Sequence, residues 1–134
     1  MANELQLKYR SPITAQASAT IPTTGMSAGA TTVLVNTPEG NCAGAQAYQC
    51  YLNVTTGPTT AATARLYCAG AYSDTTPDIF DSGSLSVVVP ASTTGEIPLG
   101  ILYDPDKYMT LKLGAESYTF VASLVVIPIL AEAQ

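Results

Sequence analysis

Apolar and polar residues alternate one by one along most of this 134-residue chain. The alternation is clearest over residues 48–54, 62–68 and 108–113. Side chains two residues apart lie on the same face of a β-strand, so this pattern predicts strands with one buried face. No apolar stripe with the helical period of 3.6 residues extends over the length of a helix. The pattern therefore predicts an all-β protein.

Turn residues divide the alternating stretches, so we expect seven to nine strands in one β-sandwich or small barrel. Residues 48–55 and 62–68 flank the turn sequence Thr-Gly-Pro-Thr and predict the clearest hairpin. Residues 118–130 are apolar on both faces, which predicts a position at the centre of a sheet or between subunits. The predicted core includes Cys50, Leu52, Val54, Leu66, Cys68, Val87, Leu111, Leu113, Phe120 and Leu124.

The N-terminal part differs from the rest, so we divide the chain into residues 1–30, an N-terminal strand and extended arm, and residues 31–134, a β domain. Residues 11–30 are rich in Ser, Thr, Ala, Gly and Pro and predict an arm or a long loop. Residues 4–10 either add to the sheet edge of a neighbouring subunit or form an edge strand of their own subunit. The candidate interface residues are Leu5, Leu7, Tyr9, Arg10 and Ile13.

The residue types that most enzymes use are scarce. The chain has no histidine, which is the common general base and a frequent metal ligand. Cys42, Cys50 and Cys68 lack the C-x-x-C spacing of zinc and redox sites. We expect buried thiols, although a Cys50–Cys68 disulfide is open if their strands are neighbours in an oxidising environment. The sequence predicts no catalytic residue, no cofactor and no metal.

Two pairs of aspartates could bind calcium in loops, namely Asp78 with Asp81 and Asp104 with Asp106. Asp is also common in turns because its side chain hydrogen-bonds to the local backbone. No complete calcium-loop pattern is present in the sequence. We therefore favour an ordinary turn role for these aspartates.

The charge pattern excludes several partners. The net charge is −5, and the five Lys and Arg residues are scattered, so we expect no nucleic acid. The longest apolar run, residues 120–130, is too short to cross a bilayer, and no secretory signal opens the chain, so we expect no membrane. Only 11% of the residues are charged. Such a surface is often covered by sister subunits or a lattice, and the alternative is a neutral, Thr-rich monomer surface.

An acidic all-β chain that opens with a polar, extended arm around residues 5–12 resembles the head decoration (cement) proteins of tailed bacteriophages. The resemblance is one of overall character across the whole chain. It implies a structural virion protein, made in the host cytoplasm, that binds the capsid exterior as a homotrimer. Its partner would be the major capsid protein, whose subunits it would clamp together. Alternatives are another small virion subunit of a coat, tail or head fibre, or a bacterial adhesin-like module, which would ordinarily need an export signal.

Overall fold

The computed structural model describes residues 5–70, 81–103 and 105–133. Within these ranges the chain forms strands and no helix, as the alternating pattern predicts. No helix long and apolar enough to span a bilayer is found among the described residues. The strands are β1 (Leu5–Tyr9), β2 (Ile13–Ile21), β3 (Leu34–Val35), β4 (Ala45–Thr56), β5 (Ala62–Gly70), β6 (Asp81–Val89), β7 (Gly95–Tyr103), β8 (Tyr108–Glu116) and β9 (Phe120–Ala133).

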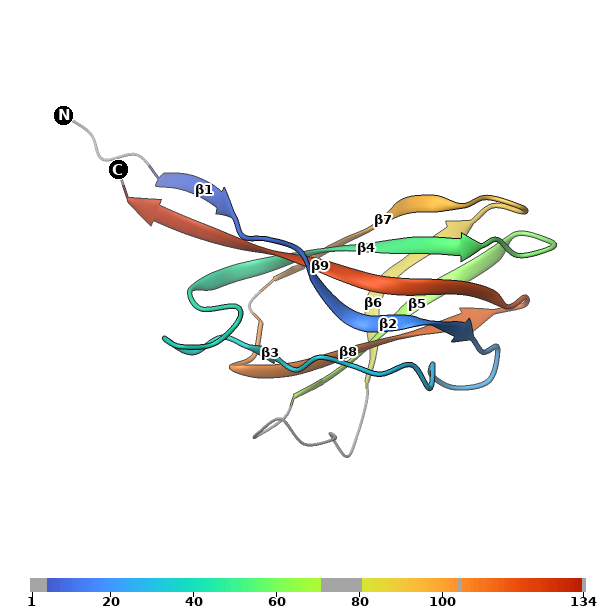
Figure 1. Cartoon of the computed structure of the whole chain (residues 1–134), viewed down its shortest axis with the longest axis horizontal. Helices are drawn as coiled ribbons and strands as arrows, with labels where there is room; N and C mark the ends of the chain where they lie inside the picture. Colours follow the sequence, from blue (N-terminus) through green and yellow to red (C-terminus); the bar gives the residue numbers. More distant parts are fainter. Residues whose placement is uncertain (1–4, 71–80, 104, 134) are drawn as a thin grey trace.

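The strands form two antiparallel sheets that face each other (Figure 1). In sheet A, β1 and β2 pair with one edge of β9, and β4 and then β7 follow on its other edge. In sheet B the order is β3-β8-β5-β6. The apolar residues 118–130 predict a central strand, and β9 is central because strands pair with both of its edges. The all-β sandwich is therefore confirmed.

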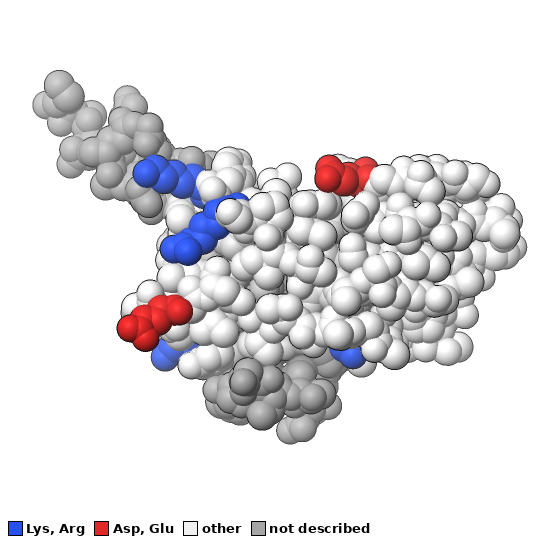
Figure 2. All heavy atoms as spheres, in the orientation of Figure 1, with Lys and Arg blue, Asp and Glu red and all other residues white. Residues whose placement is uncertain are grey.

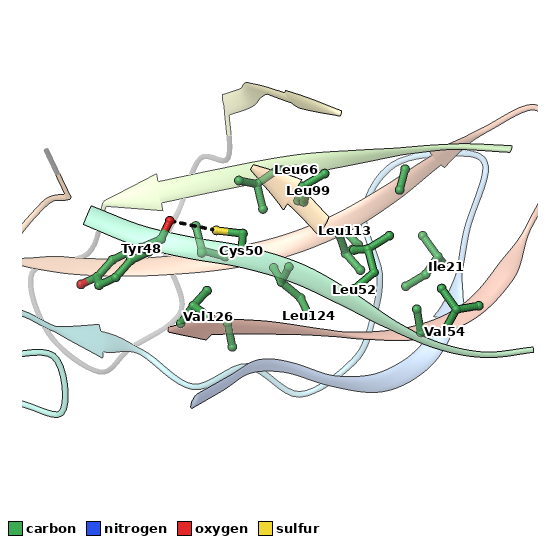
Figure 3. Packing of buried hydrophobic residues seen from close by; sticks show 14 of the residues in the cluster. Ile21, Tyr48, Cys50, Leu52, Val54, Leu66, Leu99, Leu113, Leu124 and Val126 are labelled. Atoms are coloured by element: carbon green, nitrogen blue, oxygen red, sulfur yellow. Dashed lines mark hydrogen bonds between the residues drawn. The ribbon is translucent and has the colours of Figure 1, made fainter. Parts of the chain in front are cut away.

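One core fills the space between the sheets. Leu52, Val54 and Leu124 reach into it from sheet A, and Leu66 and Leu113 reach into it from sheet B (Figure 3). Removing this apolar surface from water is the main force that holds the two layers together. Two predicted core residues, Cys68 and Val87, are only half-buried, whereas the others are buried: Cys50, Leu52, Val54, Leu66, Leu111, Leu113, Phe120 and Leu124.

The predicted hairpin is wrong, because its two strands belong to different sheets. β4 pairs with β7 and β9, whereas β5 pairs with β6 and β8. Residues 57–61 carry the chain from one layer to the other, and Pro58 is buried there. A Cβ on Gly57 would lie 2.5 Å from the backbone oxygen of Thr93, so only glycine fits this crossing. Alternation identifies the buried face of a strand, but it does not identify the neighbouring strand.

The predicted loop over residues 11–30 is also wrong in part, because residues 13–21 form β2. This strand pairs with β9 from Ile13↔Val126 to Ile21↔Phe120, with two register shifts. Ala15 and Ile21 have no exposed surface and belong to the core. The strand was missed because its small side chains give a weak alternating pattern, and the register shifts interrupt that pattern further.

Buried polar contacts close the space between β2 of sheet A and β8 of sheet B. Gln16 has no exposed surface, and its Oε1 accepts a hydrogen bond of 2.8 Å from the backbone N–H of Leu113. The Leu113 carbonyl in turn accepts a hydrogen bond of 2.8 Å from the N–H of Ser27. Residues 22–27 therefore lie along the edge of β8 and satisfy backbone groups that would otherwise be buried without partners.

β6 and β7 meet at the opposite side of the sandwich. The Leu85 side chain lies against Gly100, where an added Cβ would be only 2.9 Å from Leu85 Cδ2. Gly100 has a φ of 144°, a conformation that other residues rarely adopt. It also lies beside the register shift between β4 and β7. This glycine therefore lets the last strand of sheet A approach sheet B.

Candidate assembly surface

Burial holds two of the three cysteines and one tyrosine in their neutral forms. Cys42 and Cys50 have no exposed surface, Cys68 is half-buried, and all three are thiols. Burial, with a smaller contribution from the nearby Cys68, raises the pKa of Cys50 to about 12. Burial also raises the pKa of Cys42 and, together with the neighbouring Cys42, that of Tyr48. Cys42, Tyr48 and Cys50 therefore pack as part of the core and are not ionised at neutral pH.

The described residues contain no group of three or more His, Cys, Asp or Glu side chains that could hold a metal ion. Of the aspartates considered as calcium ligands, Asp106 is exposed. Asp78 and Asp104 lie outside the described residues, and only the backbone of Asp81 is described. Two surfaces stand out among the described residues.

The first surface is a two-stranded ribbon that projects from the sandwich. β1 pairs with β9 from Leu5↔Ala133 to Tyr9↔Ile129, whereas the pairing of β4 with β9 reaches only to Ala45↔Leu130. Figure 1 shows β1 and the end of β9 extending together beyond the other strands. We call residues 5–9 with 129–133 the β1–β9 ribbon. Within the single chain, residues 5–9 of the predicted range 4–10 form an edge strand of their own subunit, and pairing with a neighbouring subunit stays a prediction.

The structure separates the five predicted interface residues. Leu5 and Leu7 lie in the projecting part of β1, opposite Ala133 and Ala131. Tyr9 is 60% exposed at the base of the ribbon, and Arg10 beside it is exposed. The backbone N–H of Arg10 donates to the carbonyl of Pro128 over 2.9 Å. Ile13 is different, because it begins β2 and packs against the core of its own subunit.

The second surface is the outer side of sheet A. Leu52 and Leu124 are register partners that point into the core, so the alternate pair Tyr51↔Val125 points outward. The same reasoning places Gln49 and Ile127 side by side on the outer side, next to Ile101 of β7. The apolar residues at these outer positions form what we call the sheet A face: Tyr9, Tyr51, Pro98, Ile101, Tyr103, Val125, Ile127 and Ile129.

Two tyrosines flank one row of this face. The register aligns Tyr9, Ile129, Ala47 and Tyr103 across β1, β9, β4 and β7. Ile129 and Ala47, in the middle of the row, are buried although neither belongs to the main core cluster. Tyr9 and Tyr103, at its ends, are 60% and 69% exposed. Two large aromatic rings are therefore exposed on the outer side of sheet A, one at each end of the row.

The sheet A face is almost without charge. Among the outward positions of β4, β7 and the paired part of β9, the only charged residue is Glu96, at the end of the face away from Tyr9. Burial and the Glu96 carboxylate raise the pKa of Tyr51. In Figure 1, β2, β4 and β9 lie in front of the fainter β5 and β6. Figure 2 shows the middle of that same view without Lys, Arg, Asp or Glu atoms.

Most of the sheet A face is not predictable from the sequence alone. Its signal was present in residues 118–130, which are apolar on both sides although the fold buries only one side in the core. The contribution of β7, which contains Ile101 and Tyr103, cannot be predicted from the sequence, because apolar and polar residues do not alternate regularly along this strand. The tyrosines of the predicted hairpin do not share a face, because Tyr51 and Tyr67 lie on different sheets and Tyr48 is buried.

No known protein family matches the chain, and no curated protein matches it. A projecting ribbon with unpaired backbone edges can bind another chain through main-chain hydrogen bonds. An uncharged apolar face edged by tyrosines has the composition of the central part of protein–protein interfaces.

Proposed function

We propose that this chain is a structural virion protein that binds the outside of a bacteriophage capsid and stabilises the contacts between capsid subunits. It performs no catalysis, needs no cofactor, and acts at the capsid exterior after synthesis in the host cytoplasm. Its partners are the major capsid protein and further copies of itself, with the homotrimer as the expected state. Neither nucleic acid nor a membrane takes part.

The observation that carries this proposal is the projecting β1–β9 ribbon. Ala131, Glu132 and Ala133 of β9 pair with β1 on one edge, beyond the last residue that pairs with β4. An isolated two-stranded ribbon is marginally stable in water, because it has little core to bury. Contact with a partner would stabilise the ribbon. A small domain with such an extension is suited to span the boundary between two capsid subunits.

The charge at the base of the ribbon favours an acidic or polar partner surface. Lys8 and Arg10 are exposed there, in a chain with only five basic residues. Figure 2 shows basic atoms gathered where β1 leaves the body of the molecule. Exposed charges of this kind steer association and orient two partners more than they add affinity.

The test is sedimentation of the protein with capsids of the encoding phage that were assembled without it. The variant Lys8→Glu/Arg10→Glu reverses both charges at the ribbon base, and Lys107→Glu/Lys112→Glu makes the same change in net charge elsewhere on the molecule. We expect the wild type and the second variant to bind, and the first to bind at least about tenfold more weakly. Absence of wild-type binding, or equal loss in both variants, would reject capsid attachment through the ribbon.

A different structural role in a virion is the second candidate, since a coat, tail or head-fibre subunit could use the same two surfaces. The uncharged sheet A face favours it, because a self-assembling subunit must cover such a face in every copy. Electron microscopy of the purified protein separates the two candidates. A decoration protein remains a small soluble species, whereas a coat or tail subunit forms shells, tubes or fibres.

A further inference from the structure

The sheet A face differs from an ordinary solvent-facing side of a β-sandwich. Outer sides of antiparallel sheets are usually polar, which gives strands their alternation of apolar and polar residues. Here the outward residues of β9 include Val125 and Ile127, and those of β7 include Ile101 and Tyr103. Tyr103 is 69% exposed and Ile101 is 38% exposed, so this apolar surface is accessible in the single chain.

The properties of the face favour a second copy of this chain as its occupant. Interfaces between identical subunits are more apolar than those between different proteins, and charged residues are depleted at their centres. A surface that binds a copy of itself needs no opposite charges, since the same residues face one another. The sheet A face has one carboxylate, Glu96, at its margin, and no cation at the outward positions described above. A different protein that recognised this face by charge would need more charged residues than this one carboxylate.

The size of the face also fits such a contact. Four neighbouring strands about 4.8 Å apart and seven residues along β9 cover about 20 by 20 Å. This is roughly 400 Å² for each copy, which is the size of a weak, transient protein–protein contact and below that of a stable one. Two sheets of this kind pack face to face at a separation of about 10 Å. An interface of this size forms reversibly, so its dissociation can be measured.

We infer that the sheet A face is the contact surface between copies of this chain. A contact in which the same residues face one another is two-fold and joins two copies, so the inference goes beyond the homotrimer of the proposed function, and it does not depend on binding to a capsid. Tyr9 and Tyr103 border the contact on two sides, and Ile101, Val125 and Ile127 form its apolar middle. Arg65, Lys112 and Glu116, on the outer side of sheet B, lie outside the contact.

Sedimentation velocity of the isolated protein over a range of concentrations tests the inference. Tyr103→Glu places a carboxylate on the face, on edge strand β7. Val88→Glu is the matched control, because Val88 is 58% exposed on edge strand β6 and points away from the core on sheet B. We expect the wild type and Val88→Glu to associate equally, and Tyr103→Glu to associate at least about tenfold more weakly.

Circular dichroism and melting temperature establish that both variants keep the wild-type fold, and Tyr9→Glu repeats the test from the other end of the row. A wild type that is monomeric at about 100 µM would overturn the inference, as would a variant at Val88 that dissociates while Tyr103→Glu does not. Because no capsid is present, failure here leaves the capsid-binding test intact. A protein that self-associates through this face but does not sediment with capsids would reject only the decoration role.

Discussion

The two sheets share one core but have opposite outer sides. On sheet B, Arg65 of β5 and Glu116 of β8 form an ion pair across neighbouring strands, and Lys112 lies on the same side. On sheet A, the corresponding outward positions hold Tyr51, Val125 and other neutral residues. Ionic side chains keep a surface in water, whereas exposed aliphatic and aromatic side chains favour its removal from water. The two outer sides therefore differ in how strongly they favour contact with water.

Neighbouring residues of β9 provide the strongest test of the distinction between core and outer side. Leu124 has no exposed surface and lies in the core, whereas Val125 is half-buried on the sheet A face. We expect Leu124→Ala to lower the free energy of unfolding by about 2 to 5 kcal/mol, because it leaves a cavity. Val125→Ala should lower it by about 1 kcal/mol or less when measured below the concentration of association. Urea denaturation measures both, and equal costs would contradict the assignment of the two faces.

The interior also predicts a loss of stability at alkaline pH. Burial raises the pKa of Cys50 from its usual 9.0 to about 12, so the thiol ionises more readily in the unfolded chain than in the folded one. Its contribution to stability is therefore complete below pH 9 and is lost as the pH rises toward 12. The whole loss is up to about 4 kcal/mol.

Denaturation of the wild type and of Cys50→Ala at pH 8 and pH 11 measures this contribution. Cys50→Ala itself lowers the free energy of unfolding at pH 8. The relevant quantity is therefore how much this reduction changes between pH 8 and pH 11. We expect the free energy of unfolding to fall less steeply with pH in Cys50→Ala than in the wild type. Parallel pH profiles would show that Cys50 does not titrate as its buried position requires.

The sequence was sufficient to predict the fold class and most of the core, because the strict alternation in β4, β5 and β8 identifies buried faces without knowledge of partners. It was not sufficient to predict the arrangement of strands. β4 and β5 are consecutive and both amphipathic. Whether they pair in one sheet or lie in different sheets depends on the five-residue connection between them and on its contact with the loop at Thr93. The sheet A face depends on that choice, since it requires β4, β7 and β9 to lie side by side.

The contact between the two sheets at Gln16 gives a prediction of intermediate size. Gln16→Leu keeps the volume of the side chain but leaves the N–H of Leu113 buried without an acceptor, which costs about 1 to 3 kcal/mol. Gln49→Leu is the control, because Gln49 is exposed on the outer side of β4; it is measured below the concentration of association, since Gln49 lies within the sheet A face. We expect it to change the free energy of unfolding by less than about 0.5 kcal/mol.

Amide hydrogen exchange makes this test specific to the Leu113 contact. Loss of the Gln16 acceptor should increase the exchange rate of the Leu113 amide more than that of other amides in β8 that keep their partners. A uniform increase along β8 would indicate a general loss of stability. In that case Gln16 would act by packing alone, and the proposed link between β2 and β8 would be wrong.

The smallest expected effect concerns the solvated side of sheet B. Arg65 and Glu116 are 38% and 49% exposed, so water and salt screen their attraction. A double-mutant cycle with Arg65→Ala and Glu116→Ala should give a coupling energy of about 0.2 to 1 kcal/mol that decreases as salt is added. Neither substitution should change self-association, because both residues lie on the side opposite the sheet A face. Dissociation of the copies by Glu116→Ala, in a protein that keeps its melting temperature, would instead place the contact on sheet B and reverse the comparison between the two sides.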